Sequence, residues 1–138
     1  MTEYAVIDTE TTGLFPGGTD RIVEVAVVRL DSQFNEIARW ETLVNPKRDV
    51  GRTDMHHITA GDVIQAPEFN EIAGELWHHI EGAITIGHNV SFDIRFIAVE
   101  FRKAGWNLDP WKGTCTMWAA RRLGLPEKLE SCCEEVGI

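Results

Sequence analysis

The sequence predicts an α/β domain with a mixed sheet, in which a three-strand meander is followed by an alternation of helix and strand. Three strand-like segments come first, at residues 3–8, 21–30 and 34–44, and a clear helical periodicity follows at residues 67–81. The chain has 138 residues, of which 43% are hydrophobic and 25% are charged. This composition suits one globular domain and excludes a disordered chain.

The first half of the chain is predicted to form the meander. The apolar run of residues 3–8 ends at Asp8, and the Thr-, Gly- and Pro-rich residues 9–20 are predicted to be irregular. Residues 21–30 are rich in β-branched side chains that partly alternate, which is typical of a strand. The turn after them is too short for a crossover, so residues 34–44 are expected to return antiparallel as a hairpin partner.

Helices are predicted in the next part of the chain. The polar loop at residues 46–53 is followed by a short helix at about residues 60–65, which we expect Thr59 to cap. The helix at residues 67–81 has one continuous apolar face and ends at Gly82. The apolar face consists of Phe69, Ile72, Ala73, Leu76, Trp77 and Ile80.

The last third begins with a short buried strand at residues 83–86. A helix that runs to Ala104 is expected to follow, with Ser91 as its cap. Two shorter helices are predicted at residues 116–123 and 128–136. The last of these has an apolar stripe, which predicts that its two cysteines pack in the core. The stripe consists of Leu129, Cys132, Cys133 and Val136.

Charge and composition exclude several classes of protein. Thirteen Lys and Arg residues against 22 Asp and Glu residues leave a formal charge of −9, which argues against a protein that wraps nucleic acid non-specifically. No apolar run approaches the roughly 18 residues of a membrane span, and residues 1–8 lack the pattern of a secretory signal. The three cysteines form no C-x-x-C pair, and their odd number indicates a reducing compartment. We therefore expect a cytoplasmic protein that does not associate with membranes.

Three carboxylates follow predicted strands. Asp8 and Glu10 lie two residues apart, so both point to one face of the sheet if the extended backbone continues. Asp93 joins them if the strand at residues 83–86 lies parallel beside the first strand. Such acids raise one another's pKa, and a divalent cation such as Mg²⁺, which prefers oxygen ligands, relieves this. The alternatives are a solvated turn for the first pair and a helix-dipole role for Asp93.

The same segments resemble a known family. Residues 6–13 read VIDTETTG and residues 88–93 read HNVSFD. In this order they resemble the first two motifs of the DEDD (DEDDh-type) 3′–5′ exonucleases, in particular the exonuclease domain of the DNA polymerase III epsilon subunit. Between them, DMHHIT at residues 54–59 resembles the family's His-Gly-Ile segment, with His57 in place of the glycine. The resemblance covers essentially the whole chain and implies a ribonuclease-H-like fold.

What the resemblance implies is a two-metal phosphodiester hydrolase with two Mg²⁺ or Mn²⁺ ions about 3.5–4 Å apart. Asp8 is implied to bridge both ions, while the other two acids complete part of their shells. Further positions match those where the family holds or lines the terminal nucleotide: Thr11, Gly13, Leu14, His56, His88, Asn89 and Phe92. As alternatives, Phe92 belongs to the core, and His88 and Asn89 tie down a loop.

The chain departs from the family in one respect. Family members complete the site with a His-x4-Asp motif in a later helix, and no histidine follows His88 in this sequence. The pairs His57–Asp62 and His88–Asp93 have that spacing, but the first precedes the second motif and the second is that motif itself. We expect residues 1–138 to be a single exonuclease domain that lacks its C-terminal helix with the third motif. A degenerate binding module, or groups supplied by another chain, are the alternatives.

The expected substrate is the 3′ end of a single nucleic-acid strand, with DNA favoured over RNA, as in proofreading. An oligoribonuclease-like RNA trimmer is the alternative, since such a pocket holds the last nucleotide largely through phosphate, stacking and sugar contacts. Lys47, Arg48 and Arg52 either guide the strand or form a solvated loop. A polymerase or another replication or repair protein is the candidate partner, and the oligomeric state is left open.

Overall fold

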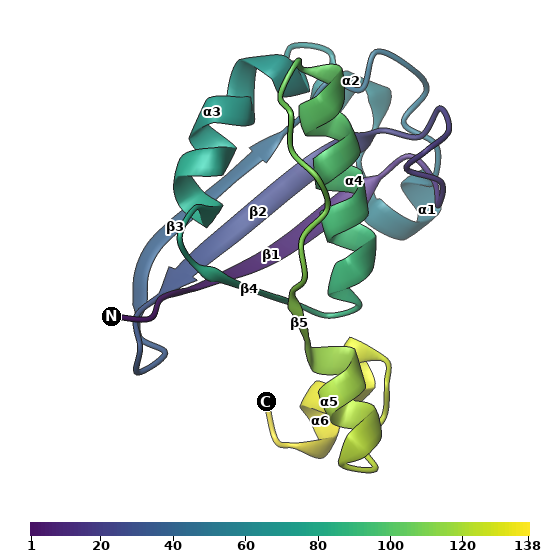
Figure 1. Cartoon of the computed structure of the whole chain (residues 1–138). Coiled ribbons are helices and arrows are strands. Elements are labelled where there is room, and N and C mark those ends of the chain that lie inside the picture. The colour runs from purple at the N-terminus through teal and green to yellow at the C-terminus, as the bar shows by residue number, and fades with distance from the viewer.

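The computed structural model describes all of residues 1–138 as a sheet with helices on both faces (Figure 1). The strands are β1 Tyr4–Thr11, β2 Ile22–Leu30, β3 Glu36–Leu43, β4 Ile84–Gly87 and β5 Thr114–Cys115. The helices are α1 Thr53–His56, α2 Ala60–Val63, α3 Phe69–Ile80, α4 Val90–Lys103, α5 Thr116–Arg122 and α6 Leu129–Glu135. None of these helices has both the length and the apolar character that a membrane crossing requires.

The strand order in the sheet is β3-β2-β1-β4-β5. β1 pairs antiparallel with β2, and β2 with β3, so the predicted meander is confirmed. β4 pairs parallel with β1, and β5 pairs parallel with β4, which makes the sheet mixed, as predicted. Thr59 caps α2 in a capping box, also as predicted. β5 escapes sequence-based prediction because two residues carry no periodic signal.

The main core lies between the sheet and the helices α3 and α4. From β1, Ala5 and Ile7 point into it. The predicted apolar face of α3 is confirmed, since Phe69 and Leu76 are fully buried. Phe101 of α4 meets Phe69 edge to face, with ring centroids 5.3 Å apart. This packing fixes α4, and with it the segment after β4, against the sheet.

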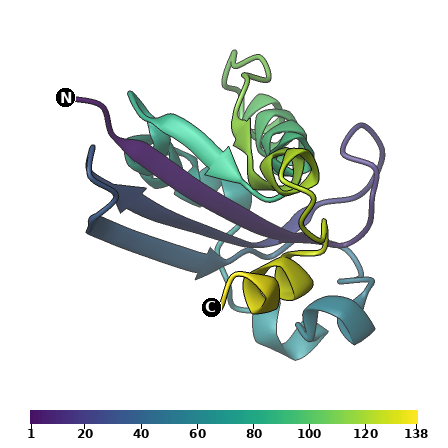
Figure 2. The ribbon, with the colours of Figure 1, turned by 90° about the horizontal axis from the view of Figure 1, so that it is seen from below.

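A smaller cluster holds α1 and α2 against the opposite face of the sheet (Figure 2). The register of β1 against β2 shifts next to Glu10, and this leaves Val23 as an extra, bulged residue of β2. The cluster consists of Val23, Val50, Ile58 and Val63. This smaller cluster therefore holds the loop after β3 beside the carboxyl end of β1.

The prediction that the first strand ends at Asp8 is wrong. β1 continues to Thr11 because its backbone stays paired with β2, with Thr9 opposite Val25. The Gly- and Pro-rich composition that suggested an irregular segment belongs only to the residues after Thr11, and threonine itself favours strands. As a result, both Asp8 and Glu10 lie inside a regular strand.

Two further details differ from the prediction. Asn89, with a φ of 58°, occupies the N-cap of α4 and no side chain caps this helix, so Ser91 is not the cap. The stripe on α6 is not core, because Leu129 and Val136 are each 51% exposed. The two short C-terminal helices lie beyond the end of β5, away from the main core (Figure 1). All three cysteines are free, as predicted.

Phe101→Ala is expected to lower the free energy of unfolding by about 3–5 kcal/mol, because it leaves a cavity in the main core. Urea unfolding followed by tryptophan fluorescence measures this. As a control, Leu123→Ala removes a side chain that is 74% exposed, and it should change the value by less than about 0.5 kcal/mol. If both variants were as stable as the wild type, the assignment of the core would be wrong.

Candidate active site

Asp8 and Glu10 lie on the face of β1 that points away from the main core. The alternate residues Ile7, Thr9 and Thr11 are buried on the other side of the strand. The two-residue spacing therefore places both carboxylates on one face, as the sequence predicted. Asp8 is exposed to solvent and Glu10 is half-buried.

Asp93 reaches the same strand from the first turn of α4. β4 pairs with β1 only as far as Val6, so the following edge of β1 has no strand beside it. There the backbone N–H and the hydroxyl of Thr9 both donate to Asp93 Oδ1, at 2.9 and 2.6 Å. Asp93 is only 4% exposed. Its side chain accepts the backbone hydrogen bond that a neighbouring strand would otherwise accept.

The three acids lie in an environment that disfavours their negative charge. Burial, and then the charge of Asp8, raise the pKa of Asp93 to about 6, although the hydrogen bonds from Thr9 lower it. Neighbouring protein atoms partly desolvate Asp8 and raise its pKa as well. Desolvation and the charges of Asp8 and Glu24 raise the pKa of Glu10. A bound cation relieves each of these unfavourable effects.

Two glutamates that were not predicted, Glu24 and Glu41, extend this acidic face. Glu24 lies directly opposite Glu10 in the strand register. Desolvation, followed by the charges of Glu41 and Asp8, raises its pKa. The regular register of β1 against β2, which holds from Tyr4 to Glu10, sets Glu24 opposite Glu10, and the bulge at Val23 follows this pair. The strand register has no clear signature in this sequence, so the pairing becomes visible only in the folded sheet.

The donor set is suited to a hard divalent cation, since it consists of carboxylate oxygens. Asp93 Oδ2 makes no hydrogen bond to the protein and is not sealed from solvent. However, no group of three His, Cys, Asp or Glu side chains is arranged as a ready-made metal cage. The expected cluster of Asp8, Glu10 and Asp93 is therefore a set of acids around one strand. The three carboxylates do not converge on one point, because Asp93 is bound at the edge of the strand whereas Asp8 and Glu10 project from its face.

Thr11, Gly13 and Leu14 lie where β1 enters the loop of residues 12–20. The Thr11 hydroxyl donates to the Gly13 carbonyl at 2.7 Å. A Cβ atom on Gly13 would lie 2.4 Å from Asp20 Oδ2, so the close approach of Asp20 requires glycine here. Thr11 and Gly13 therefore shape the loop. Leu14 is 56% exposed, so its side chain is free to contact a ligand.

His56 is held in its loop through both ring nitrogens. The N–H of Ile58 donates to Nδ1 at 3.0 Å, so the proton lies on Nε2, which is 3.0 Å from the Val50 carbonyl. Neither nitrogen is free for a nucleotide, and sequence alone could not show these backbone contacts. His57, at the C-cap of α1, has a φ of 60°, a backbone conformation that favours the glycine of the family's segment.

His88 and Asn89 connect β4 to α4. His88 Nδ1 lies 3.0 Å from Thr116 Oγ1, and its Nε2 contacts the carbonyl of Glu127. The ring therefore ties the start of α5 and the loop before α6 to the end of β4. Asn89 adopts the left-handed conformation, which asparagine tolerates better than most residues. These contacts are those expected if His88 and Asn89 hold a loop in place, which was the alternative to a role in binding the nucleotide.

Phe92 lies at the edge of the main core. It is half-buried, packs against the core cluster, and meets the ring of Phe96 with centroids 4.9 Å apart. Most of its contacts are therefore those of a core residue, and only the remaining part of the ring is at the surface.

The mixed sheet, with acids gathered around the carboxyl half of its central strand, defines a ribonuclease-H-like α/β domain. Exonuclease I shares this fold, with a TM-score of 0.81 and 22% identity over 100% of this chain and 36% of the other. Residues 5–137 match the model of the RNase_T family, which is described as exonuclease. The chain belongs to this exonuclease family, and the family predicted from the two motifs is confirmed.

Curated relatives support the same assignment. The DNA polymerase III subunit epsilon of Pasteurella multocida is 30% identical over 148 residues, which cover 99% of this chain and 58% of that protein. A DNA polymerase III subunit epsilon-like protein of Rhodobacter capsulatus is 38% identical over 109 residues, which cover 77% of this chain and 16% of that protein. The chain thus spans less than two thirds of the length of either relative.

Asp93→Asn is expected to stabilise the protein at neutral pH. Because the pKa of Asp93 is about 6 in the fold and 3.8 ordinarily, the folded state holds a proton that the unfolded state releases. Stability therefore falls as the pH rises through this interval, by about 3 kcal/mol at about 1.4 kcal/mol per pKa unit. Asparagine keeps the acceptor for Thr9 but does not titrate. Urea unfolding should show the variant to be more stable than the wild type at pH 7 and similar at about pH 4.

The matched control is Asp109→Asn, since the side chain of Asp109 is 94% exposed. This control should follow the wild type at every pH. If the difference between Asp93→Asn and the wild type were the same at both ends of the range, the raised pKa of Asp93 would be refuted.

Proposed function

We propose that this protein is a 3′–5′ exonuclease of the proofreading type, which hydrolyses phosphodiester bonds at DNA 3′ ends. One observation carries the proposal. Thr9 joins Asp93 to the strand that bears Asp8 and Glu10, so the acids of the family's first two motifs surround one strand. Their raised pKa values indicate a site built to receive positive charge.

In this proposal Asp8, Glu10 and Asp93 hold two Mg²⁺ or Mn²⁺ ions. When bound, the ions supply an activated water and stabilise the leaving 3′ oxygen. Thr9 orients the Asp93 carboxylate by binding Oδ1, which leaves Oδ2 available at the site. Leu14 follows the strand in an exposed loop, where it offers an apolar contact for the terminal base.

Similarity to other proteins favours single-stranded DNA as the substrate of this one. Exonuclease I of E. coli, which shares this fold, has been solved in complex with a dT13 oligonucleotide. Two relatives are epsilon or epsilon-like subunits of DNA polymerase III, so we propose a replicative polymerase as the partner. We also propose a cytoplasmic location, where the three free cysteines stay reduced.

The general base and the fourth carboxylate are proposed to come from outside residues 1–138. No histidine follows His88 in this sequence, and the ring nitrogens of both His56 and His88 are engaged within the protein. Loss of a general base costs about 10²–10⁴-fold in rate. Residues 1–138 alone are therefore expected to hydrolyse DNA slower by about this factor than a chain that includes a His-x4-Asp helix. A full rate from residues 1–138 in a single-turnover assay would refute this.

Asp8→Ala is expected to abolish Mg²⁺- or Mn²⁺-dependent trimming of a 5′-labelled oligonucleotide, because it removes the carboxylate at the centre of the site. The assay uses excess protein and long incubation, and resolves the products by gel electrophoresis. As a control, Asp109→Ala removes an exposed carboxylate away from the site and should trim at the wild-type rate.

Two results would overturn the assignment. Unchanged trimming by Asp8→Ala would remove the metal role of this residue. Absence of any trimming by a wild-type chain that includes a His-x4-Asp helix would favour a binding module on the same fold.

A further inference from the structure

A cationic hollow lies beyond the carboxyl end of β1, outside the acidic site. Its volume is about 600 Å³, and four of its eight lining residues are cations. It is lined by Gly18, Thr19, Arg21, Pro46, Lys47, Arg48, Asp49 and Lys103. This gathering of positive charge stands out in a chain whose net charge is −9.

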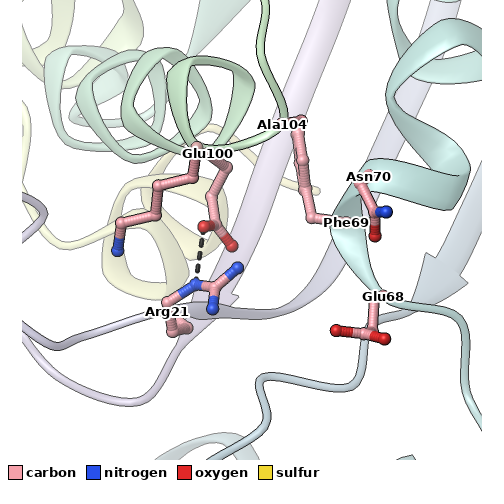
Figure 3. Close-up of a pocket in the computed structure, with 7 residues that line it drawn as sticks. Arg21, Glu68, Phe69, Asn70, Glu100 and Ala104 are labelled. Carbon is pink, nitrogen blue, oxygen red and sulfur yellow. Dashed lines mark hydrogen bonds and ion pairs between the residues drawn. The ribbon is translucent and has the colours of Figure 1, made fainter.

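Arg21 forms the inner wall of the cationic hollow. Its Nε donates to the carboxylate of Glu100 at 2.7 Å, and Glu100 is only 2% exposed (Figure 3). The two Nη groups of Arg21 make no hydrogen bond to the protein. A buried carboxylate thus holds the guanidinium in place by one edge, while its other N–H groups stay available to an external anion. Arg21 also lines an adjoining cavity of about 310 Å³, shown in Figure 3.

The two lysines of the hollow have no ion-pair partner. Lys103, the last residue of α4, is exposed. Lys47 has a φ of 52°, and its backbone N–H donates to Asn45 Oδ1 at 2.9 Å.

The remaining charges of the hollow are mostly satisfied. Arg48 Nη1 donates to Asp20 Oδ1 at 3.1 Å and to the Thr19 carbonyl at 3.2 Å. The carboxylate of Asp49 accepts the N–H of Gly51 at 2.6 Å. The unpaired donors are therefore those of Arg21, Lys47 and the lysine at the end of α4.

The hollow lies a short way from the acidic site. The Thr12 N–H donates to the Arg21 carbonyl at 2.9 Å, and the Arg21 N–H donates to the Thr12 hydroxyl at 3.0 Å. Thr12 is two residues beyond Glu10, which is about 7 Å along an extended chain. On α4, Glu100 is two helical turns after Asp93, about 10 Å along the axis. A strand of nucleic acid that ends at the acids therefore needs only a few more nucleotides to reach the hollow.

We propose that the cationic hollow binds a backbone phosphate of the single strand, a few nucleotides upstream of its 3′ end. The proposal rests on the proposed function and adds a second point of contact to it. Unpaired N–H groups from three separate segments, on the β2 start, the loop after β3 and the end of α4, are suited to phosphate oxygens. Both lysines of the hollow are exposed, which suits a strand that passes over it.

The test measures binding of fluorescein-labelled dT16 and dT3 to residues 1–138 by fluorescence anisotropy, in EDTA so that no hydrolysis is needed. The double variant Lys47→Gln/Lys103→Gln is compared with Lys112→Gln/Lys128→Gln, which removes the same charge elsewhere. At low salt the first variant should bind dT16 about five- to tenfold more weakly, and its slope of log affinity against log salt should fall by about 1.4. The control should stay within about twofold of the wild type. Binding of dT3 should not change in either variant.

The proposal would be overturned if the wild type did not bind dT16, if both double variants lost the same affinity for dT16, or if the first double variant also lost affinity for dT3. It would also be overturned if inorganic phosphate at constant ionic strength displaced dT16 from the wild type but not from the first double variant. The last result would indicate a site for free phosphate. Selective loss of dT16 binding, together with no trimming in Mg²⁺ by a chain that includes a His-x4-Asp helix, would support the hollow while contradicting the exonuclease. The two proposals can therefore fail separately.

Discussion

The bond between Thr9 and Asp93 is the interaction on which the rest of the site depends. β4 is too short to cover the edge of β1, and a buried backbone N–H without an acceptor is costly. The Asp93 carboxylate satisfies both the N–H and the hydroxyl of Thr9. In doing so it fixes the first turn of α4 to the strand that carries Asp8 and Glu10. The contact that satisfies the hydrogen-bonding groups at the strand edge is therefore the same contact that brings the acids of the site together.

The same contact explains why the site is electrostatically unfavourable in isolation. A neutral side chain on α4 would also accept from Thr9, yet the chain has a carboxylate there, next to Asp8 and in a position where burial raises its pKa to about 6. Glu10 and Glu24, opposed across two strands, add to this. Folding alone does not require so many acids on one face, because like charges directly opposite each other destabilise a sheet. The divalent cations of the proposed function would offset this repulsion.

Sequence periodicity predicted the features that depend on near neighbours along the chain. It placed Asp8 and Glu10 on one face and gave the apolar face of α3, because a period of two or 3.6 fixes side-chain direction locally. It could not show that both nitrogens of His56 bind backbone groups, or that the strand register sets Glu24 against Glu10. Those contacts depend on loop conformation and strand register, which arise from packing between distant segments. The motif order identified the family, whereas the roles of individual residues required the fold.

Helix α4 links the two charged regions of the molecule. Asp93 and Glu100 are seven residues apart on its buried side. The first binds Thr9 of β1, and the second binds Arg21, the residue before β2. A buried ion pair is weak evidence for stability, because desolvation offsets much of its attraction. Its better supported use is to hold a charged group in one geometry. Since one rigid helix carries both anchors, the spacing between the acidic site and the cationic hollow is fixed by helical rise. In the proposed complex, a protein of net negative charge would in this way guide a polyanion along a defined path without a generally basic surface.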